Sequence, residues 1–302
     1  MTGHLTILIA ACGRGELLAK TLASLSQAQA LDQVDQVVVV ENDTEPRLEA
    51  VVQASQSSLP TSYLFSEQRN KSLALNRGLQ VCRDGLIVFL DDDVRVDPQL
   101  IHAYQEGSGQ FGPPVFFGGP FGVDYRRQPD DSFLPYMTAS TKGWSLGGSD
   151  QWVNRRTCFL GFNWAAYRGD LMAIGGFDAR FGPGARSGAT GQESQAQRKL
   201  RSRHGRGRYL SQAMVWHHVS EEQVQPEWIL RRRERAGREL GQIINTSLPR
   251  LLRTPAAHAA IALQRLRFRR AHVWNEQLQQ FDQQWWNAYT TGTLATVRHR
   301  QD

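Results

Sequence analysis

Short apolar segments alternate with helical patterns in the first third of the chain, and this alternation constrains the fold more than any other feature. The apolar segments are residues 5–11, 36–40, 62–65 and 86–90. Between them, apolar side chains recur at helical spacing in residues 16–26, 48–56 and 70–82. Strands this apolar need cover on both faces, and crossover helices supply it. We therefore predict an α/β fold with a Rossmann-like, mostly parallel central sheet and helices on both faces.

The rest of the chain has a looser pattern. Glycine, proline and aromatic residues are frequent in residues 112–148, which predicts short strands and a long loop. We expect a helix at 192–203, a basic helix at 225–244 and a helical extension beyond it. No apolar run approaches the roughly 20 residues that a membrane-spanning helix requires. Residues 1–11 lack the cationic start of a secretory signal, so we expect none.

The composition is that of a folded protein with a surplus of arginine. The net charge is +6, and only 4 of the 35 basic residues are lysines. Arginine suits bidentate contacts with phosphate or carboxylate groups, although codon usage would produce the same bias. Cys12, Cys82 and Cys158 form no CxxC pair, so we expect a reducing compartment and no structural disulfide.

The strongest local signal is the aspartate triplet that directly follows the apolar segment 86–90. In an extended chain, residues two apart point the same way, so we expect Asp91 and Asp93 to converge while Asp92 points elsewhere. Two carboxylates at the carboxyl end of a parallel strand offer oxygen ligands to Mg²⁺ or Mn²⁺, and such an ion can bridge a diphosphate. The alternative is a solvated turn whose carboxylates cap the next helix.

Two further signals are weaker when each is taken alone. His217 and His218 lie in an expected strand, where an imidazole can bind a metal ion or simply pack in the core. Glu193 opens an expected helix after a glycine-rich loop. A carboxylate there either acts as a general base facing a cleft or only complements the helix dipole.

Taken together, these segments resemble the family 2 glycosyltransferases, which are inverting, nucleotide-sugar-dependent enzymes of the GT-A fold. The resemblance covers roughly residues 4–240 and lies in the order of the segments. They are 5–11, 37–43, 70–78 (NKSLALNRG), 89–93 (FLDDD), 159–168 (FLGFNWAAYR), 174–178 (IGGFD), 191–193 and 216–219 (WHHV).

The resemblance implies a role for each matching position. It implies Glu193 as the catalytic base, and a Mn²⁺ or Mg²⁺ site formed by Asp91, Asp93 and His217. The donor-binding residues would be Glu41, Asn42, Lys71, Asn76, Asp91 and Asp92. The acceptor side would be lined by Asn163, Trp164 and Asp178, and Asp178 is also the second candidate for the base.

Three positions depart from the pattern of the family. Glu41 stands where these enzymes usually carry an Asp that reads the nucleobase, so the base of the donor is open. Leu75 stands where an arginine is common, and Lys71 or Arg77 could compensate. The usual Glu-Asp pair is Gln192-Glu193, so the base would be one methylene longer.

The resemblance therefore predicts a metal-dependent glycosyltransferase with a nucleoside-diphosphate sugar, expected to be a UDP-sugar, as donor. The acceptor would be a saccharide or a lipid-linked molecule. We expect residues 1–244 to form the GT-A domain, with a donor half (1–107) and an acceptor half (108–244). Residues 245–302 would form an Arg/Trp-rich helical extension.

Other functions remain as alternatives at this point. One is an inactive homologue that only binds nucleotide-sugar, and another is a basic nucleic-acid-binding protein, although we expect no nucleic acid. A dinucleotide oxidoreductase is excluded because Gly13 and Gly15 are not followed by the third glycine of GxGxxG.

The expected location is the cytoplasm, with two interpretations of the basic C-terminal part. Arginines in 225–244, with Arg265, Arg267, Arg269 and Arg270 beyond, either rest on an anionic membrane at its inner face or form a solvated or acid-paired face. In the second case, apolar residues such as Ile229 and Ile244 pack against the catalytic domain.

Overall fold

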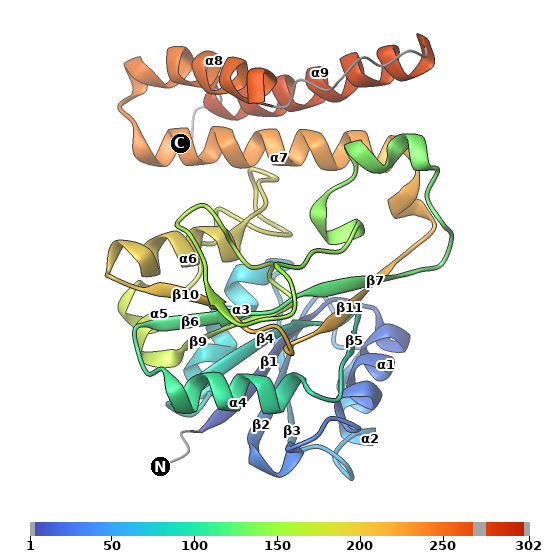
Figure 1. Cartoon of the computed structure of the whole chain (residues 1–302), viewed down its shortest axis with the longest axis vertical. Coiled ribbons are helices and arrows are strands. Elements are labelled where there is room, and N and C mark those ends of the chain that lie inside the picture. The colour runs from blue at the N-terminus through green and yellow to red at the C-terminus, as the bar shows by residue number, and fades with distance from the viewer. Residues whose placement is uncertain (1–3, 268–275, 299–302) are drawn as a thin grey trace. The chain divides into compact units, whose positions relative to one another are not determined.

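A computed structural model describes residues 4–267 and 276–298 (Figure 1). The chain divides into two compact units. The first consists of Met1–Asp124, Lys142–Ala179 and Gln192–His218, and the second of Tyr125–Thr141, Arg180–Gly191 and Val219–Asp302. The domain boundary expected after residue 244 falls inside a helix of the second unit, and that division stays a prediction.

The first unit is built on a mixed sheet with the strand order β3-β2-β1-β4-β9-β6-β10-β8. Strands β1 to β4 are mutually parallel, whereas β9 runs antiparallel to β4 and to β6. The strands are β1 (Leu5–Ala11), β2 (Val34–Asn42), β3 (Thr61–Ser66), β4 (Leu86–Asp91), β6 (Val115–Gly118), β8 (Gln151–Trp152), β9 (Trp164–Tyr167) and β10 (Arg206–Tyr209). The predicted α/β class with a mostly parallel centre is confirmed.

Helices cover both faces of this sheet because successive strand residues point in opposite directions. Ile7, Ile9 and Val88 belong to one apolar core, which includes residues of α1 and α4. Leu8 and Phe89 belong to the other, which includes residues of α3 and α6. The helices are α1 (Gly15–Leu25), α2 (Glu49–Ala54), α3 (Lys71–Val81), α4 (Leu100–Gln110), α5 (Arg168–Ala173) and α6 (Gln192–Ser202).

A smaller sheet with the order β5-β11-β7 adjoins the carboxyl end of β4 in sequence. Its strands are β5 (Val94–Val96), β7 (Phe121–Tyr125) and β11 (Val215–Val219). The antiparallel register of β11 and β5 sets His217 opposite Val94. The backbone N–H of His218 donates to the carbonyl of Asp93 at 2.8 Å. This pairing therefore brings the histidine strand to the aspartate triplet, across more than a hundred residues of sequence.

The second unit is helical. Its long helices are α7 (Pro226–Ser247), α8 (Arg250–Arg267) and α9 (Glu276–Arg298), which pack on one another (Figure 1). Helices α7 and α9 approach closely because glycines face the partner backbone: a Cβ on Gly237 would lie 2.2 Å from the Tyr289 carbonyl oxygen. The helical extension expected from the sequence is confirmed for the described residues, whereas Arg269 and Arg270 lie outside them. No described helix is long and apolar enough to cross a membrane.

Candidate active site

The aspartate triplet spans the end of a strand and the turn after it. Strand β4 ends at Asp91, and β5 begins at Val94, so Asp92 and Asp93 lie in the turn between them. The expected alternation, with Asp92 pointing elsewhere, is wrong because the chain is no longer extended after Asp91. Asp92 is instead fully buried, and its carboxylate faces the same partner as that of Asp93.

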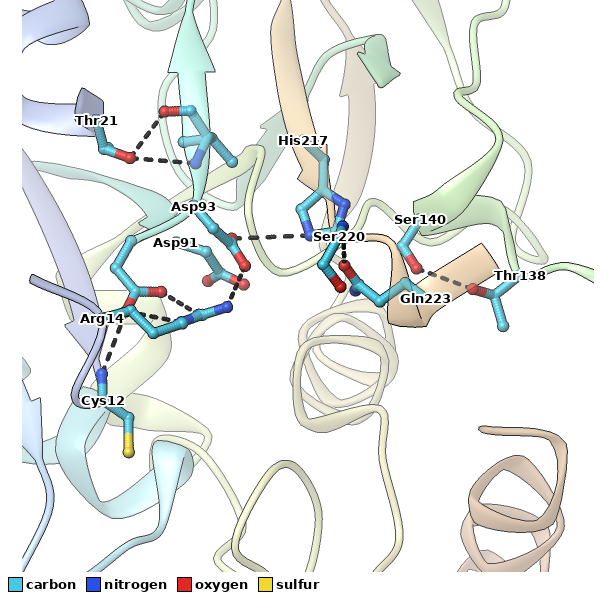
Figure 2. Close-up of polar contacts among 12 residues, drawn as sticks. Cys12, Arg14, Thr21, Asp91, Asp93, Thr138, Ser140, His217, Ser220 and Gln223 are labelled. Carbon is cyan, nitrogen blue, oxygen red and sulfur yellow. Dashed lines mark hydrogen bonds and ion pairs between the residues drawn. The ribbon is translucent and has the colours of Figure 1, made fainter. Parts of the chain in front are cut away.

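That shared partner is Arg14, in the turn between β1 and α1. Its Nη1 donates to Asp93 Oδ2 at 2.5 Å, and its Nε donates to Asp92 Oδ2 at 3.3 Å (Figure 2). Burial alone would lower the pKa of Arg14, but the charges of Asp93 and Asp92 outweigh burial and raise it. Burial raises the pKa of Asp92 to about 6, against the opposing effect of Arg14. The backbone N–H of Cys12 also donates to Asp92, so this carboxylate holds both the turn and Arg14.

Asp91, the third carboxylate, has a different partner. Lys71 opens α3, where the side chain of Asn70 caps the helix by accepting from the N–H of Leu73 at 3.1 Å. The Lys71 ammonium forms an ion pair with Asp91. Burial would lower the pKa of Lys71, but Asp91 and, more weakly, Glu193 and Asp93 raise it overall. Lys71 is therefore a half-buried cation that pairs with Asp91 and is within electrostatic reach of Glu193 and Asp93.

Glu193 lies in the first turn of α6, as expected. Its half-buried carboxylate lies beside Gly161, since a Cβ at that glycine would be 3.5 Å from Glu193 Oε2. The electrostatic effect of Glu193 on Lys71 puts this carboxylate in the same group of charges as Asp91 and Asp93. The residues predicted as base and as metal ligands thus gather in one part of the first unit.

His217 approaches Asp93 on a side that Arg14 does not occupy. The distance between His217 Nε2 and Asp93 Oδ1 is 3.7 Å (Figure 2). The imidazole stacks on Phe162 with ring centroids 4.7 Å apart. Asp93 Oδ1 is buried, and no hydrogen bond from any described residue reaches it. A buried carboxylate oxygen without a donor is costly unless another group binds it.

This pair of atoms fits part of a divalent-metal site. Within residues 4–267 and 276–298, no group of three or more His, Cys, Asp or Glu side chains is arranged to hold a metal ion. Mg²⁺ sites, however, often use one or two carboxylates and take their remaining ligands from substrate phosphates and water. Asp93 Oδ1 and His217 Nε2 could serve as such a partial set, whereas Asp91 is engaged with Lys71.

Glu41, predicted to read the nucleobase, is fully buried and has internal partners. Its Oε2 accepts hydrogen bonds from the N–H groups of Arg47 and Leu48, each at 3.0 Å, and from the hydroxyl of Tyr63 at 2.6 Å. These contacts fix the loop after β2. The neighbouring Asn42 is also buried.

Other predicted donor and acceptor residues are engaged with the backbone or packed in the core. The Asn76 amide exchanges two hydrogen bonds, both 2.8 Å, with the backbone of Phe177. Asn163 is 1% exposed, and its amide contacts Pro120, Ala213 and the Tyr104 hydroxyl. Trp164 is equally buried and stacks on Phe89. Neither Asn163 nor Trp164 is exposed to an acceptor in this structure, while Asp178 is half-buried.

Three charged residues near the site were not assigned a role from the sequence. Arg14 could have been found by the rule used for the aspartates, because it follows the carboxyl end of β1. Asp43 and Arg69 form an ion pair with 2.7 Å between Arg69 Nε and Asp43 Oδ1. Asp43 follows the end of β2 and Arg69 precedes α3, so both also lie at the edge where ligands of such sheets bind. No sequence pattern indicates that they pair.

Comparisons with known proteins concern the family and the fold of the chain. Residues 6–155 match the model of glycosyl transferase family 2. No curated protein matches the sequence. The structure is similar to a mannosyltransferase from Pyrobaculum calidifontis in complex with GDP-Man and Mn²⁺, with a TM-score of 0.61 and 15% identity. That match covers 100% of this chain and 89% of the other.

A second similar structure is GalNAc-T7 with UDP, GalNAc and Mn²⁺, with a TM-score of 0.56 and 11% identity. This match covers 82% of the present chain and 52% of that chain, so the chain spans about half the length of this relative. At such low identities the two likenesses show the fold alone, and that fold is GT-A.

Proposed function

Residues 6–155 belong to glycosyl transferase family 2, and on that premise we propose that the protein moves a sugar from a nucleoside-diphosphate sugar to an acceptor hydroxyl with inversion. The observation that carries the proposal is the gathering of Glu193, Lys71 and the Asp93–His217 pair in one part of the first unit. A carboxylate for proton removal and cations for a diphosphate are the groups that such a transfer requires.

In the proposed reaction, Glu193 accepts the proton of the acceptor hydroxyl as that oxygen attacks the anomeric carbon. The bond between the anomeric carbon and the diphosphate oxygen breaks in the same step, and the nucleoside diphosphate leaves with the electron pair. One displacement inverts the configuration and needs no covalent intermediate, unlike the double displacement of a retaining glycosidase. Glu193 is half-buried in the first turn of α6 and lies beside Gly161.

The charge of the departing diphosphate has to be balanced by groups fixed in the site. Asp91 holds the Lys71 ammonium, and Asp92 and Asp93 hold the Arg14 guanidinium. Because both cations are already fixed in place, they need little reorganisation to face a phosphate. Asp93 Oδ1 and His217 Nε2 would hold Mg²⁺ or Mn²⁺, which would add positive charge next to the phosphates. Asp92 would act on the donor indirectly, by positioning Arg14.

The donor and acceptor follow less directly from the residues. We propose a UDP-sugar as donor, as expected from the sequence, but the structures similar to this chain hold GDP-Man or UDP, so both nucleotides should be tested. The proposed acceptor is a saccharide or a lipid-linked molecule, and the proposed location is the cytoplasm.

The experiment is a donor panel with and without Mn²⁺, measuring release of the nucleoside diphosphate and the anomeric configuration of the product by NMR. Glu193→Gln keeps the shape of the side chain but cannot accept a proton, so turnover should fall about 10²–10⁴-fold while donor binding persists. The matched control is Glu106→Gln, an exposed carboxylate on α4.

Two results would reject parts of the proposal. Turnover of Glu193→Gln equal to that of the control would move the base to another residue, with Asp178 the next candidate. A wild-type protein that binds nucleotide-sugar but never releases nucleoside diphosphate would be an inactive binding homologue.

A further inference from the structure

The arginines of α7, which the sequence offered as a membrane-binding group, are mostly engaged within the second unit. Arg231 pairs with Glu222 at 2.5 Å, and Arg238 pairs with Glu234 at 2.7 Å. Arg233 lies over an indole ring of α9, with 3.5 Å from its guanidinium carbon to the ring centroid. These contacts favour an acid-paired face for the arginines of α7, whose Ile244 packs with residues of α8 and α9. The next helix in the chain has different properties.

Helix α8 has one face that packs against its neighbours. Ala257 and Ile261, four residues apart, are buried. Ala257 belongs to a small apolar cluster with Ile244 of α7 and Val297 of α9. An amphipathic surface helix would carry polar residues on the side opposite this buried face.

The opposite face of α8 is apolar as well. Leu251 is 92% exposed, Leu252 54% and Leu266 63%. At 3.6 residues per turn these leucines share the outer side of the helix with Leu263 and with exposed Pro255, Ala259 and Ala262. Four of the seven large apolar residues that the described structure exposes lie in this one helix. Such a concentration of apolar side chains in water marks an interaction surface.

The charged residues of α8 all have the same sign. Arg267 flanks the apolar face on one side and Arg265 flanks it on the other, whereas Arg253 is half-buried and donates to the carbonyl of Leu248 at 3.0 Å. The helix contains no aspartate or glutamate. An apolar strip bordered by arginines is typical of helices that lie in the interface of an anionic bilayer.

We propose that the outer face of α8 (Leu251, Leu252, Leu263 and Leu266 with the flanking arginines) binds the surface of an anionic lipid bilayer. The leucines enter the boundary between headgroups and acyl chains, and the guanidinium groups contact lipid phosphates. A second copy of this chain is a poorer occupant, because two such faces would bring arginines together with no acidic residue of α8 to pair them. The proposal does not depend on the catalytic chemistry.

The test is co-sedimentation of the full chain with vesicles of phosphatidylcholine alone or with added phosphatidylglycerol, at low and high salt. The wild type should sediment with the anionic vesicles and be released by salt. Leu251→Gln/Leu252→Gln should reduce the partition coefficient at least about tenfold. Arg265→Gln/Arg267→Gln, which removes the exposed arginines on either side of the apolar face, should reduce it about 25-fold at low salt, from about fivefold for each arginine.

The matched control is Val81→Gln/Leu146→Gln, which removes two exposed apolar side chains outside α8 and should leave sedimentation unchanged. Unaltered circular dichroism and Tm of each variant verify that the fold is intact, as expected for exposed positions. The proposal is overturned if the wild type stays in the supernatant with anionic vesicles at low salt, or if the leucine double variant sediments like the wild type. It is also overturned if light scattering shows that the wild type is a dimer and the leucine double variant is a monomer.

Discussion

Glu41, at the carboxyl edge of the sheet, allows a direct test of whether a predicted donor-binding residue stabilises the fold or binds the nucleotide. The resemblance to the family predicts that this residue reads the nucleobase, whereas the structure gives its carboxylate three internal donors. Burial and the Glu41 carboxylate both raise the pKa of Tyr63, so the hydroxyl remains a donor over the whole physiological range. We expect Glu41→Ala to act mainly on stability.

The magnitude follows from the hydrogen bonds that would be lost. Glu41→Ala leaves the N–H groups of Arg47 and Leu48 and the Tyr63 hydroxyl without their acceptor. Each buried donor left without an acceptor costs about 1–3 kcal/mol in free energy of unfolding. Because the structure around the three donors can partly relax, we expect a total loss of about 3–6 kcal/mol. At about 2–4 °C per kcal/mol for domains of this size, Tm should fall by roughly 6–24 °C.

Thermal unfolding and UDP affinity, measured together, distinguish the two roles. Tyr63→Phe should cost about 1–3 kcal/mol, and its effect should largely disappear in the Glu41→Ala background, since the two side chains share one hydrogen bond. Tyr63→Phe should leave the Kd for UDP within about twofold of the wild type. A Glu41→Ala variant that keeps the wild-type Tm but loses UDP affinity would refute this reasoning.

Three further expectations are open to simple measurements. Asn163→Ala removes three buried hydrogen bonds and should cost about 3–5 kcal/mol in urea unfolding; an unchanged midpoint would contradict the core assignment. Burial raises the pKa of Cys82 to about 12, so iodoacetamide at about pH 8 should label half-exposed Cys158 before it labels Cys82. Peptide mass spectrometry follows the order of labelling. Hydrogen bonds from the Thr44 N–H and from Arg69 lower the pKa of Asp43. The stability they add is therefore present above about pH 4 and lost as the pH falls below that, and the Tm difference between wild type and Asp43→Asn should shrink on acidification.

The sheet was predictable from the sequence because its central strands are almost wholly apolar. Burial on both faces requires that pattern, so β1 and β4 were located within a residue of their ends. Strand β2 extends beyond the expected segment at both ends, because polar Asp35 lies at a register shift before Gln36 and polar Glu41 and Asn42 still pair with β3. The short strands between residues 112 and 167 have no periodicity long enough to position them.

The site was only partly predictable. The strand-end rule identified Asp91 and Asp93, and the family resemblance added Glu193 and His217. Neither source gives the direction of a side chain in a turn, so the position of Asp92 beside Arg14 was missed. Burial was also missed for Asn163, whose amide closes hydrogen bonds to segments far away in the chain.

The sequence by itself determined the parallel strands, the helices between them and the sheet edge where charged residues collect, because these depend on the periodicity of nearby side chains. Only the tertiary structure decided which charges pair, since Arg14 meets Asp92 across 78 residues and Lys71 meets Asp91 across 20. It also decided which faces of a helix are covered. The leucines of α8 have the spacing of a core, yet neighbouring helices bury only the side that carries Ala257 and Ile261. Coulomb attraction and burial act on distances in space, and those distances exist only after the chain has folded.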